Sequence, residues 1–291
     1  MNISVGVLAY NEEQNIERLL DTLMRQTVPL KEVFVVSSGS TDKTNDIVRR
    51  FANKKVRLIV QEKRLGKASA INEFLRRASS KIVVVASADI MLEEDTISEL
   101  CKPFRKEGIG IVASHPVPEP TRNMILEGII QMQWRLHHEL SLQNPKFGEL
   151  IAFRNVVRSI HNTSVDEECL AKEIRALGFE GCYAARAIVH NKGPETVRDF
   201  LKQRRRIFCG HLELRKLHGY SAASMNTRHI AKALGTTLRW RDIPQAIAAG
   251  LLESTGRMLG AWDYYHKRDK HYIWDIAKTT KDASYNNPSN I

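Results

Sequence analysis

The sequence predicts an α/β protein with a mostly parallel central sheet, followed by a basic helical extension. Short apolar runs alternate with segments of helical spacing four times within the first ninety residues, which is typical of a doubly wound sheet. Residues 82–86 form a continuous apolar run, as expected for a strand that is buried on both faces. The formal net charge of +11 is uneven, because residues 1–182 carry +1 and residues 183–291 carry +10.

The first part of the chain supplies four strands and three helices. The expected strands are residues 3–8, 33–36, 56–60 and 81–86. Helices are expected from about residue 12, over 43–51 and over 64–77. Right-handed crossovers would place the carboxyl ends of these strands along one edge, where open α/β sheets bind their ligands.

The second part is less regular. Further strands are expected at residues 108–114, 149–153 and 179–189. Helices are expected at residues 122–142 and 165–177, and from Pro194 through the basic run 203–206. This order predicts one domain over residues 1–222 and a helical extension over residues 223–291, whose last residues, 286–291, we expect to be disordered.

Composition limits the cellular context. The four cysteines, at positions 101, 169, 182 and 209, have no metal-binding spacing, which predicts reduced thiols in a cytoplasmic protein. The sequence shows neither a cleavable signal peptide nor an apolar stretch of the roughly 18 residues that a membrane span requires. A basic extension indicates an anionic partner, and the absence of the usual nucleic-acid-binding motifs argues against DNA or RNA.

Asp89 follows the buried run 82–86 almost directly, with Ser87 and Ala88 between them. A carboxylate at the carboxyl end of a central parallel strand lies where ligands bind, so we expect Asp89 to contact a ligand or a metal ion. The alternative is an N-cap for the helix that starts near Glu93, but Asp89 lies too far from that helix for this role to be favoured.

Six short motifs in series carry a resemblance to a known family. They are VLAYNEE at 7–13, STDKT at 40–44, GKASAIN at 66–72, SAD at 87–89, VDEE at 165–168 and QRRRI at 203–207. Their order and spacing resemble those of family 2 glycosyltransferases of GT-A fold, with Ile207 where that family has Trp. The resemblance implies inverting transfer of a sugar from a nucleotide-sugar such as a UDP-, GDP- or dTDP-sugar.

The resemblance also implies a nucleotide-sugar half over about 1–115, with the donor site over the strand ends, and an acceptor half over about 116–222. The Tyr10 ring can stack on a base in the donor site, and the Glu12 carboxylate can accept hydrogen bonds from a base or a ribose. Glu12 could equally be a first-turn residue that favours the helix dipole. The family usually has an acidic pair after the second strand, where Ser37 and Ser38 stand here. The donor-binding residues implied are Tyr10, Glu12, Ser38, Asp42, Lys67, Ala88 and Asp89.

A divalent cation is the cofactor that the resemblance implies, as Mg²⁺ or Mn²⁺ bridging the donor diphosphate. Asp89 matches the second carboxylate of the family's Asp-x-Asp pair, and Ser87 stands at the first. One carboxylate with phosphate oxygens and waters can suffice for a hard cation. His190 is a second candidate ligand, although a structural role for it is at least as plausible.

The resemblance assigns the role of general base to Asp166, which matches the catalytic base of the inverting members. The alternative for residues 166–168 is an acidic first turn of a helix capped by Ser164. Gln203, Arg205 and Arg206 correspond to residues that contact the acceptor or the diphosphate, and arginine suits bidentate contact with phosphate.

The extension interleaves aromatic residues with basic ones around a helix at residues 243–259. This pattern suits an anionic membrane surface, and a helical appendage packed on the catalytic domain is about equally plausible. We therefore expect a peripheral glycosyltransferase at the cytoplasmic face of the membrane that acts on a hydroxyl of a glycan or lipid-linked glycan. The alternatives are a polyprenyl-phosphate sugar synthase and a non-catalytic nucleotide-sugar-binding protein, the latter suggested by the serines at positions 37, 38 and 87.

Overall fold

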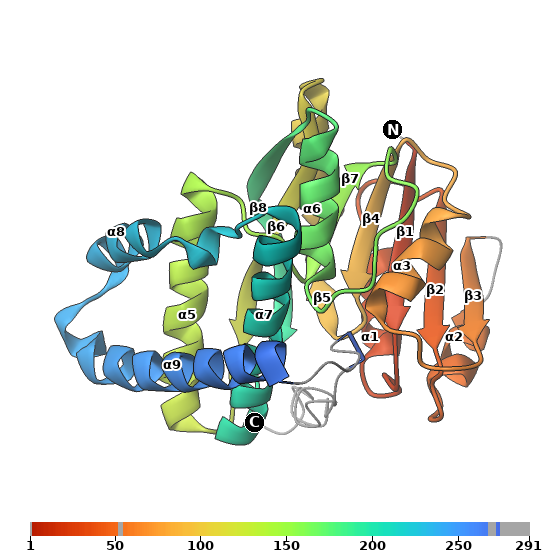
Figure 1. Ribbon diagram of the computed structural model, residues 1–291. Coiled ribbons are helices and arrows are strands. Elements are labelled where there is room, and N and C mark those ends of the chain that lie inside the picture. The colour runs from red at the N-terminus through yellow and green to blue at the C-terminus, as the bar shows by residue number, and fades with distance from the viewer. Residues whose placement is uncertain (1, 52–54, 267–271, 274–291) are drawn as a thin grey trace.

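The computed structural model describes residues 2–51, 55–266 and 272–273 of the chain (Figure 1). The expectation of disorder at residues 286–291 falls outside this range. In the described part, a single sheet runs through the right and centre of the view in Figure 1, and the last helices lie to its left. The expected α/β class with a helical C-terminal extension is confirmed.

The sheet has eight strands in the order β3-β2-β1-β4-β7-β6-β8-β5 among the described residues. Strands β1 to β4 are parallel, whereas β7 runs antiparallel to both β4 and β6. The carboxyl end of β4 is therefore next to the start of β7. The strand bounds are β1 Ile3–Ala9, β2 Glu32–Ser38, β3 Val56–Gln61, β4 Ile82–Ser87, β5 Ile90–Leu92, β6 Ile109–Glu119, β7 Leu150–Arg154 and β8 Glu180–Lys192.

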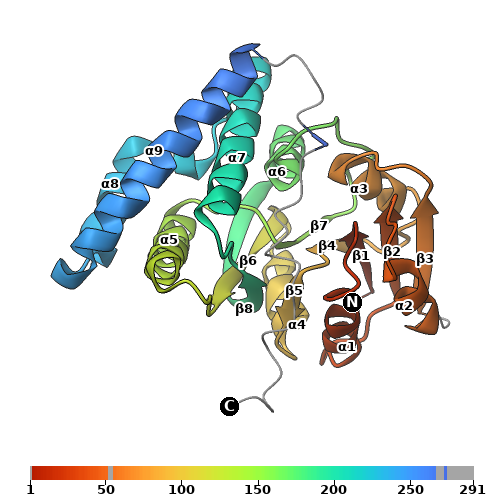
Figure 2. The same cartoon turned by 90° about the horizontal axis from the view of Figure 1, so that it is seen from below.

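Helices cover both faces of the sheet (Figure 2). Helices α1, α2 and α4 pack on one face through a buried apolar cluster that includes Leu19, Ile47 and Ile97. Helices α3 and α6 pack on the other face through a cluster that includes Phe74 and Leu170. These bounds are α1 Ile16–Met24, α2 Thr44–Phe51, α3 Lys67–Leu75, α4 Thr96–Cys101 and α6 Asp166–Ala176.

The second half of the chain adds a helical layer beside the sheet. Its helices are α5 Met124–Gln143, α7 Val197–His218, α8 Thr227–Thr237 and α9 Ile243–His266. A third buried cluster joins Leu126 and Ile130 of α5 to Phe200 of α7 and Ala249 of α9. None of the helices that the structure describes combines the length and apolar character needed to cross a bilayer.

Two glycines let α9 approach α7 closely. A Cβ on Gly256 would come 2.5 Å from the Cβ of Arg204, and a Cβ on Gly260 would come 2.5 Å from the backbone oxygen of Arg205. Such distances exclude any side chain unless the helices move apart. The four-residue spacing of the two glycines therefore gives α9 a smooth face against the arginine-bearing part of α7.

The predicted elements agree with the structure except near the ends of several segments. The first helix begins at Ile16 rather than near Glu12, because Asn11 adopts a left-handed conformation with φ 52° and a turn follows it. The sequence also did not predict β5, which has only three residues. Short strands of this kind carry too few residues for a periodic pattern.

Candidate active site

A cavity of about 1150 Å³ opens at the carboxyl ends of β1, β2 and β4, between α3, α6 and α7. Cavities that bind small molecules have volumes of about 300–1,000 Å³, so this one can hold a large ligand or two substrates. Among the described residues, eight Lys or Arg and six Asp or Glu line it, which favours an anionic ligand. The basic residues are Arg64, Lys67, Lys146, Lys192, Lys202, Arg204, Arg205 and Arg206.

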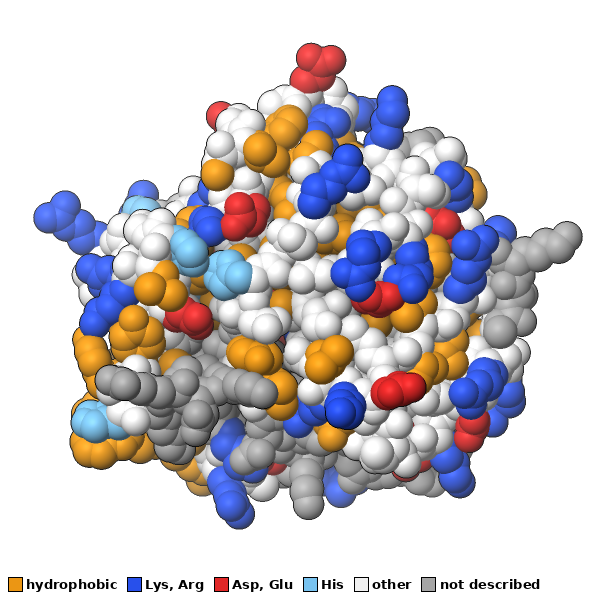
Figure 3. Space-filling view, turned by 45° about the vertical axis from the view of Figure 1, so that its right-hand side comes forward, with side chains coloured by type: hydrophobic (Ala, Val, Ile, Leu, Met, Phe, Trp, Pro, Cys, Tyr) orange, Lys and Arg blue, Asp and Glu red, His pale blue; other side chains and the backbone are white. Residues whose placement is uncertain are grey.

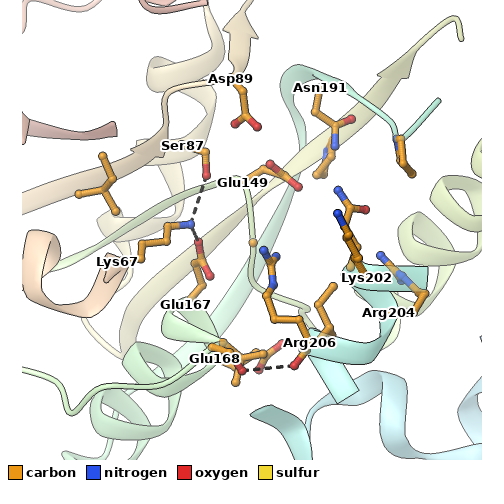
Figure 4. A pocket seen from close by; sticks show the side chains of 18 of the residues that line it. Lys67, Ser87, Asp89, Glu149, Glu167, Glu168, Asn191, Lys202, Arg204 and Arg206 are labelled. Carbon is orange, nitrogen blue, oxygen red and sulfur yellow. Dashed lines mark hydrogen bonds and ion pairs between the residues drawn. The ribbon is translucent and has the colours of Figure 1, made fainter. Parts of the chain in front are cut away.

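Lys67 joins the two sides of the cavity. It stands in the first turn of α3, and its Nζ forms an ion pair with Glu167 of α6 and donates a hydrogen bond of 3.2 Å to the Ser87 Oγ of β4 (Figure 4). Burial lowers the pKa of Lys67, but the carboxylates of Glu167, Asp166 and Glu149 outweigh burial and raise it. Lys67 is therefore a fixed positive charge in the cavity.

The three acidic residues in the first turn of α6, at positions 166–168, have different surroundings. Glu167 lines the cavity, whereas Asp166 is only 1% exposed and is not among the lining residues. Burial, with the charge of Glu167, raises the pKa of Asp166 to about 7. Burial raises the pKa of Glu167 too, but the Lys67 ammonium outweighs it and the pKa is lowered. Glu168 accepts hydrogen bonds from the Tyr220 hydroxyl, at 2.7 Å, and from the backbone of Phe147, at 3.3 Å.

The side chains in the basic run of α7, residues 203–206, also have different partners. Gln203, Arg205 and Arg206 all line the cavity. However, the Arg205 guanidinium donates hydrogen bonds to Asp263 of α9 from Nε and from Nη2, with Nη2 at 2.5 Å from Oδ1. Burial lowers the pKa of Arg206, although Glu167 and Asp166 partly restore it. Arg206 is therefore the arginine of this run that lies close to the α6 carboxylates.

Another part of the cavity carries the residues expected to hold a nucleoside. Tyr10, Glu12 and Ser38 line it, and the Arg64 guanidinium carbon lies 4.1 Å from the centre of the Tyr10 ring. The Ser38 hydroxyl accepts a hydrogen bond of 3.2 Å from the backbone of Leu65. An aromatic ring beside a guanidinium offers a flat surface on which a base can stack.

Asp42 does not line the cavity, although the sequence places it in the donor site. Its carboxylate accepts hydrogen bonds from the backbone of Glu13, at 3.1 Å, and of Thr44, at 3.0 Å. It therefore fixes the loop before α2 against the loop that carries Glu12. The motif that includes Asp42 shapes the site through the backbone rather than through direct contact.

His190 and Asn191 are consecutive residues of β8, and their side chains have different surroundings. The Nε2 of His190 lies 3.3 Å from Glu93, and His190 is not among the lining residues. Asn191 lines the cavity and is 7% exposed. Successive residues of a strand point to opposite faces, so only one of the two can face the cavity. The sequence singles out His190 as a metal ligand, whereas the structure brings Asn191 next to the ends of β4 and β7.

Asp89, Glu149 and Asn191 surround one part of the cavity, with Ser87 beside them (Figure 4). Ala88 also lines the cavity. Glu149 adopts a left-handed conformation with φ 52°, which is uncommon for a residue other than glycine. Burial and the nearby Asp89 carboxylate raise the pKa of Glu149 to about 7. The Asn191 Oδ1 is buried and has no hydrogen-bond partner in the part of the chain that the structure describes. Carboxylate and amide oxygens suit Mg²⁺ or Mn²⁺, so these residues fit a hard cation.

Several lining residues were not predicted. Glu149 and Asn191 stand at strand ends that the sequence does not join to the motif region. Tyr272, which the sequence groups with membrane-facing aromatics, lines the cavity, and its ring lies 3.0 Å from where a Cβ on Gly66 would stand. The neighbouring Lys267, Arg268, Lys270 and Trp274 fall outside the described residues.

Several solved structures have a fold similar to that of this chain. A mannosyltransferase from Pyrobaculum calidifontis, solved in complex with GDP-Man and Mn²⁺, has a TM-score of 0.65 and 21% identity, over 92% of this chain and 88% of that one. Glucosyl-3-phosphoglycerate synthase from Mycobacterium tuberculosis, in complex with Mn²⁺, UDP and glucosyl-3-phosphoglycerate, has a TM-score of 0.52 and 18% identity, over 73% and 79%. At these identities the likeness shows the fold, which is GT-A.

Sequence relatives agree with this fold. A poly-beta-1,6-N-acetyl-D-glucosamine synthase from Staphylococcus epidermidis is 29% identical over 116 residues, which is 39% of this chain and 28% of that protein. Glycosyltransferase GlyA of Streptococcus pneumoniae is 31% identical over 101 residues, which is 34% of this chain and 14% of that protein. The family model described as Glycosyl transferase family 2 matches residues 4–159, more than half of the chain. The chain therefore belongs to glycosyl transferase family 2.

Proposed function

We propose that this protein transfers a sugar from a nucleotide-sugar to a hydroxyl of a glycan or lipid-linked glycan, with inversion and with a divalent cation. The observation that carries the proposal is the cavity itself. It places an aromatic and acidic nucleoside end, with Tyr10 and Glu12, beside Asp89 and a group of cations. A diphosphate lying between them would be contacted by Lys67 and Arg206. The mannosyltransferase and phosphoglycerate-glucosylating relatives, with their Mn²⁺ and nucleotides, support this arrangement.

The general base in this proposal is a carboxylate in the first turn of α6. Glu167 is our first candidate because its side chain lines the cavity. Asp166, which the sequence favours, is the second candidate because a pKa of about 7 suits a base at neutral pH. In either case the base would take the acceptor proton as the hydroxyl attacks the anomeric carbon, and the nucleoside diphosphate leaves from the opposite side. Lys67 and Arg206 would stabilise the charge that develops on the leaving diphosphate.

A lipid phosphate is a second candidate acceptor, and one observation favours it. Lys146 and Lys202 add positive charge to the cavity beyond the residues that would hold the donor diphosphate. A phosphate monoester is already an anion at neutral pH, so it attacks without the help of a general base. The two acceptors therefore predict different effects when the α6 carboxylates are removed.

We further propose that the protein binds the cytoplasmic face of the membrane through α9. Apolar side chains spaced three, four or seven residues apart form an exposed stripe along this helix, with Leu251 67% and Met258 69% exposed. Lys and Arg side chains are spread over the face drawn in Figure 3 rather than gathered in one patch. The stripe is then the main contact in this proposal. Its members are Ile243, Ile247, Leu251, Met258, Trp262 and Tyr265.

Isothermal titration calorimetry with UDP-, GDP- and dTDP-sugars, in Mn²⁺ and in EDTA, tests the donor site. We expect one nucleotide to bind more tightly in Mn²⁺, and Asp89→Asn to remove most of that difference. Equal affinity in both media would take the cation out of the mechanism. Binding without sugar transfer to any hydroxyl or phosphate acceptor would favour a non-catalytic binding protein.

A further inference from the structure

We propose that Glu149 supplies the carboxylate that is missing at Ser87, so that Asp89, Glu149 and Asn191 together hold a divalent cation. This inference rests on the proposed function, since it names residues that would hold the cation of that reaction. Mg²⁺ and Mn²⁺ are bound through oxygen ligands, and more carboxylates in a site give tighter binding. A site with Asp89 as its single carboxylate would depend heavily on the phosphates of the donor.

The sheet places Glu149 beside Ser87. Strands β4 and β7 are antiparallel, and Ala86 pairs with Leu150. The next pair along this register is Ser87 and Glu149, and the Ser87 amide donates a hydrogen bond of 3.0 Å to the Glu149 carbonyl oxygen. Directly opposite residues of an antiparallel pair project their side chains to the same side of the sheet. A carboxylate at position 149 can therefore reach the space that a carboxylate at position 87 would occupy.

The backbone at Glu149 supports a role at the cavity. Its φ of 52° lies in the left-handed region, although Gly148 stands immediately before it and could have taken that conformation without cost. Backbone strain of this kind collects at functional sites, where the surrounding structure holds it in place. The side chain lines the cavity and lies close enough to Asp89 for the two carboxylates to repel each other. A cation between them would remove that repulsion.

Asn191 gives an independent indication of a ligand. It pairs with Ile90 across β8 and β5, which brings it next to Asp89, and it is 7% exposed. Its side chain is hydrogen-bonded to Glu149, yet its Oδ1 is buried with no hydrogen-bond partner among the described residues. Burying an amide oxygen without a hydrogen-bond partner is energetically unfavourable. A cation in the cavity would satisfy this oxygen together with the two carboxylates (Figure 4).

Mn²⁺ titration followed by electron paramagnetic resonance tests the site directly, because bound Mn²⁺ loses the sharp signal of the free ion. Glu149→Gln keeps the size of the side chain and removes its charge, so we expect the affinity for Mn²⁺ to fall at least about tenfold. The double variant Ser87→Asp with Glu149→Gln moves the carboxylate across the strand pair and should restore most of the affinity. Glu12→Gln removes another carboxylate that lines the same cavity but is not part of the proposed cation site, and it should leave Mn²⁺ affinity within about twofold.

Mn²⁺ affinity in Glu149→Gln that equals that of the unmodified protein would overturn the inference. An equal loss in Glu12→Gln would also overturn it, because it would show a general effect of charge. Restoration by Ser87→Asp excludes misfolding as the cause of any loss.

Nucleotide binding, measured separately in EDTA, distinguishes this inference from the proposed function. Nucleotide binding with no Mn²⁺ binding by the unmodified protein would overturn the cation site alone. Mn²⁺ binding that depends on Glu149, with no affinity for any nucleotide, would overturn the proposed function and support the cation site.

Discussion

Lys67 and Glu167 are one hundred positions apart in the chain, and their ion pair closes one side of the cavity between α3 and α6. Lys67 holds the Glu167 carboxylate ionised, since the pair lowers the pKa of Glu167 against the effect of burial. A carboxylate that lines the cavity and stays ionised can accept a proton over a wide range of pH. Asp166, which precedes Glu167 in α6, has a pKa of about 7 and would be about half ionised at neutral pH.

Glu167→Gln should lower turnover with a hydroxyl acceptor by about 10²–10⁴-fold and leave donor affinity little changed, because it removes basicity but not size. Asp166→Asn is the matched variant one position away. Steady-state rates with a fixed acceptor, together with calorimetric donor binding, measure both effects. The variant with the larger loss identifies the base, and near-normal turnover in both would favour a phosphate acceptor.

The pH dependence of turnover separates the same two residues without a substitution. With Asp166 as base, turnover should rise with pH and level off above about 7, following the pKa of that carboxyl. With Glu167 as base, whose pKa is lowered, turnover should already be level well below pH 7. The test is a rate profile at saturating donor, repeated in Asp166→Asn to show whether any inflection disappears.

Stability should also report on Asp166. Its pKa is about 7 in the folded protein, above the ordinary value of 3.8, so the folded state binds a proton more readily than the unfolded state. The free energy of unfolding should therefore fall as pH rises from about 4 to 7, by about 2–4 kcal/mol from this group. Asp166→Asn should remove that fall. Urea denaturation at several pH values gives the difference between the two proteins.

Glu32 provides a control of opposite sign. Burial raises its pKa, but hydrogen bonds from Ser4 and Ser79 outweigh burial and lower it. Its contribution to stability is present above pH 4.5 and is lost as the pH falls below that value. Glu32→Gln should therefore lose stability relative to the unmodified protein as pH rises. The same direction of change in both variants would contradict the assigned pKa shifts.

The fold could largely be predicted from the sequence, because long buried strands and amphipathic helices leave strong periodic patterns. The run from Ile82 to Ala86 makes up all of β4 except its last residue, and the alternation of strands and helices up to Asp89 gives the parallel half of the sheet. Which side chains meet across the cavity was harder to predict. Glu149 faces Ser87 only because β7 returns antiparallel beside β4, and strand order is set by packing far along the chain.

Neighbouring residues on one element also escaped prediction. Asp166 and Glu167 are adjacent in an acidic run, and His190 and Asn191 are adjacent on β8, yet only Glu167 and Asn191 line the cavity. A sequence motif identifies the segment that reaches a site. The exact side chain depends on how a helix or strand is rotated about its axis, which the motif does not record.

Gly260→Ala should destabilise the protein by about 1–3 kcal/mol, because the added methyl would meet the Arg205 carbonyl oxygen at 2.5 Å. Gly250 lies on the same helix, and no neighbouring residue that the structure describes would come within 4 Å of a Cβ added there. Gly250→Ala should therefore stabilise the protein by about 0.5–1 kcal/mol. Chemical denaturation measures both. Equal effects would show that α9 does not pack closely on α7.

Leu251→Glu should weaken binding to anionic liposomes, since it places a charge in the middle of the exposed stripe of α9. Leu177→Glu is a matched control, because Leu177 is 56% exposed at the end of α6, away from the stripe. Sedimentation with phosphatidylserine vesicles measures both variants at low and high salt. Equal binding by both would remove α9 from the membrane contact.

The contact between α9 and α7 couples the position of α9 to the arginines of the cavity. Gly260 touches the backbone of Arg205, and Asp263 one turn later holds the Arg205 side chain. Any tilt of α9 would shift Arg205 and, through the same turn of α7, Arg206. If a membrane surface holds α9 as proposed, these contacts would also restrict where the two arginines lie. Binding at the outside of the molecule and the position of charge inside the cavity would then be mechanically connected.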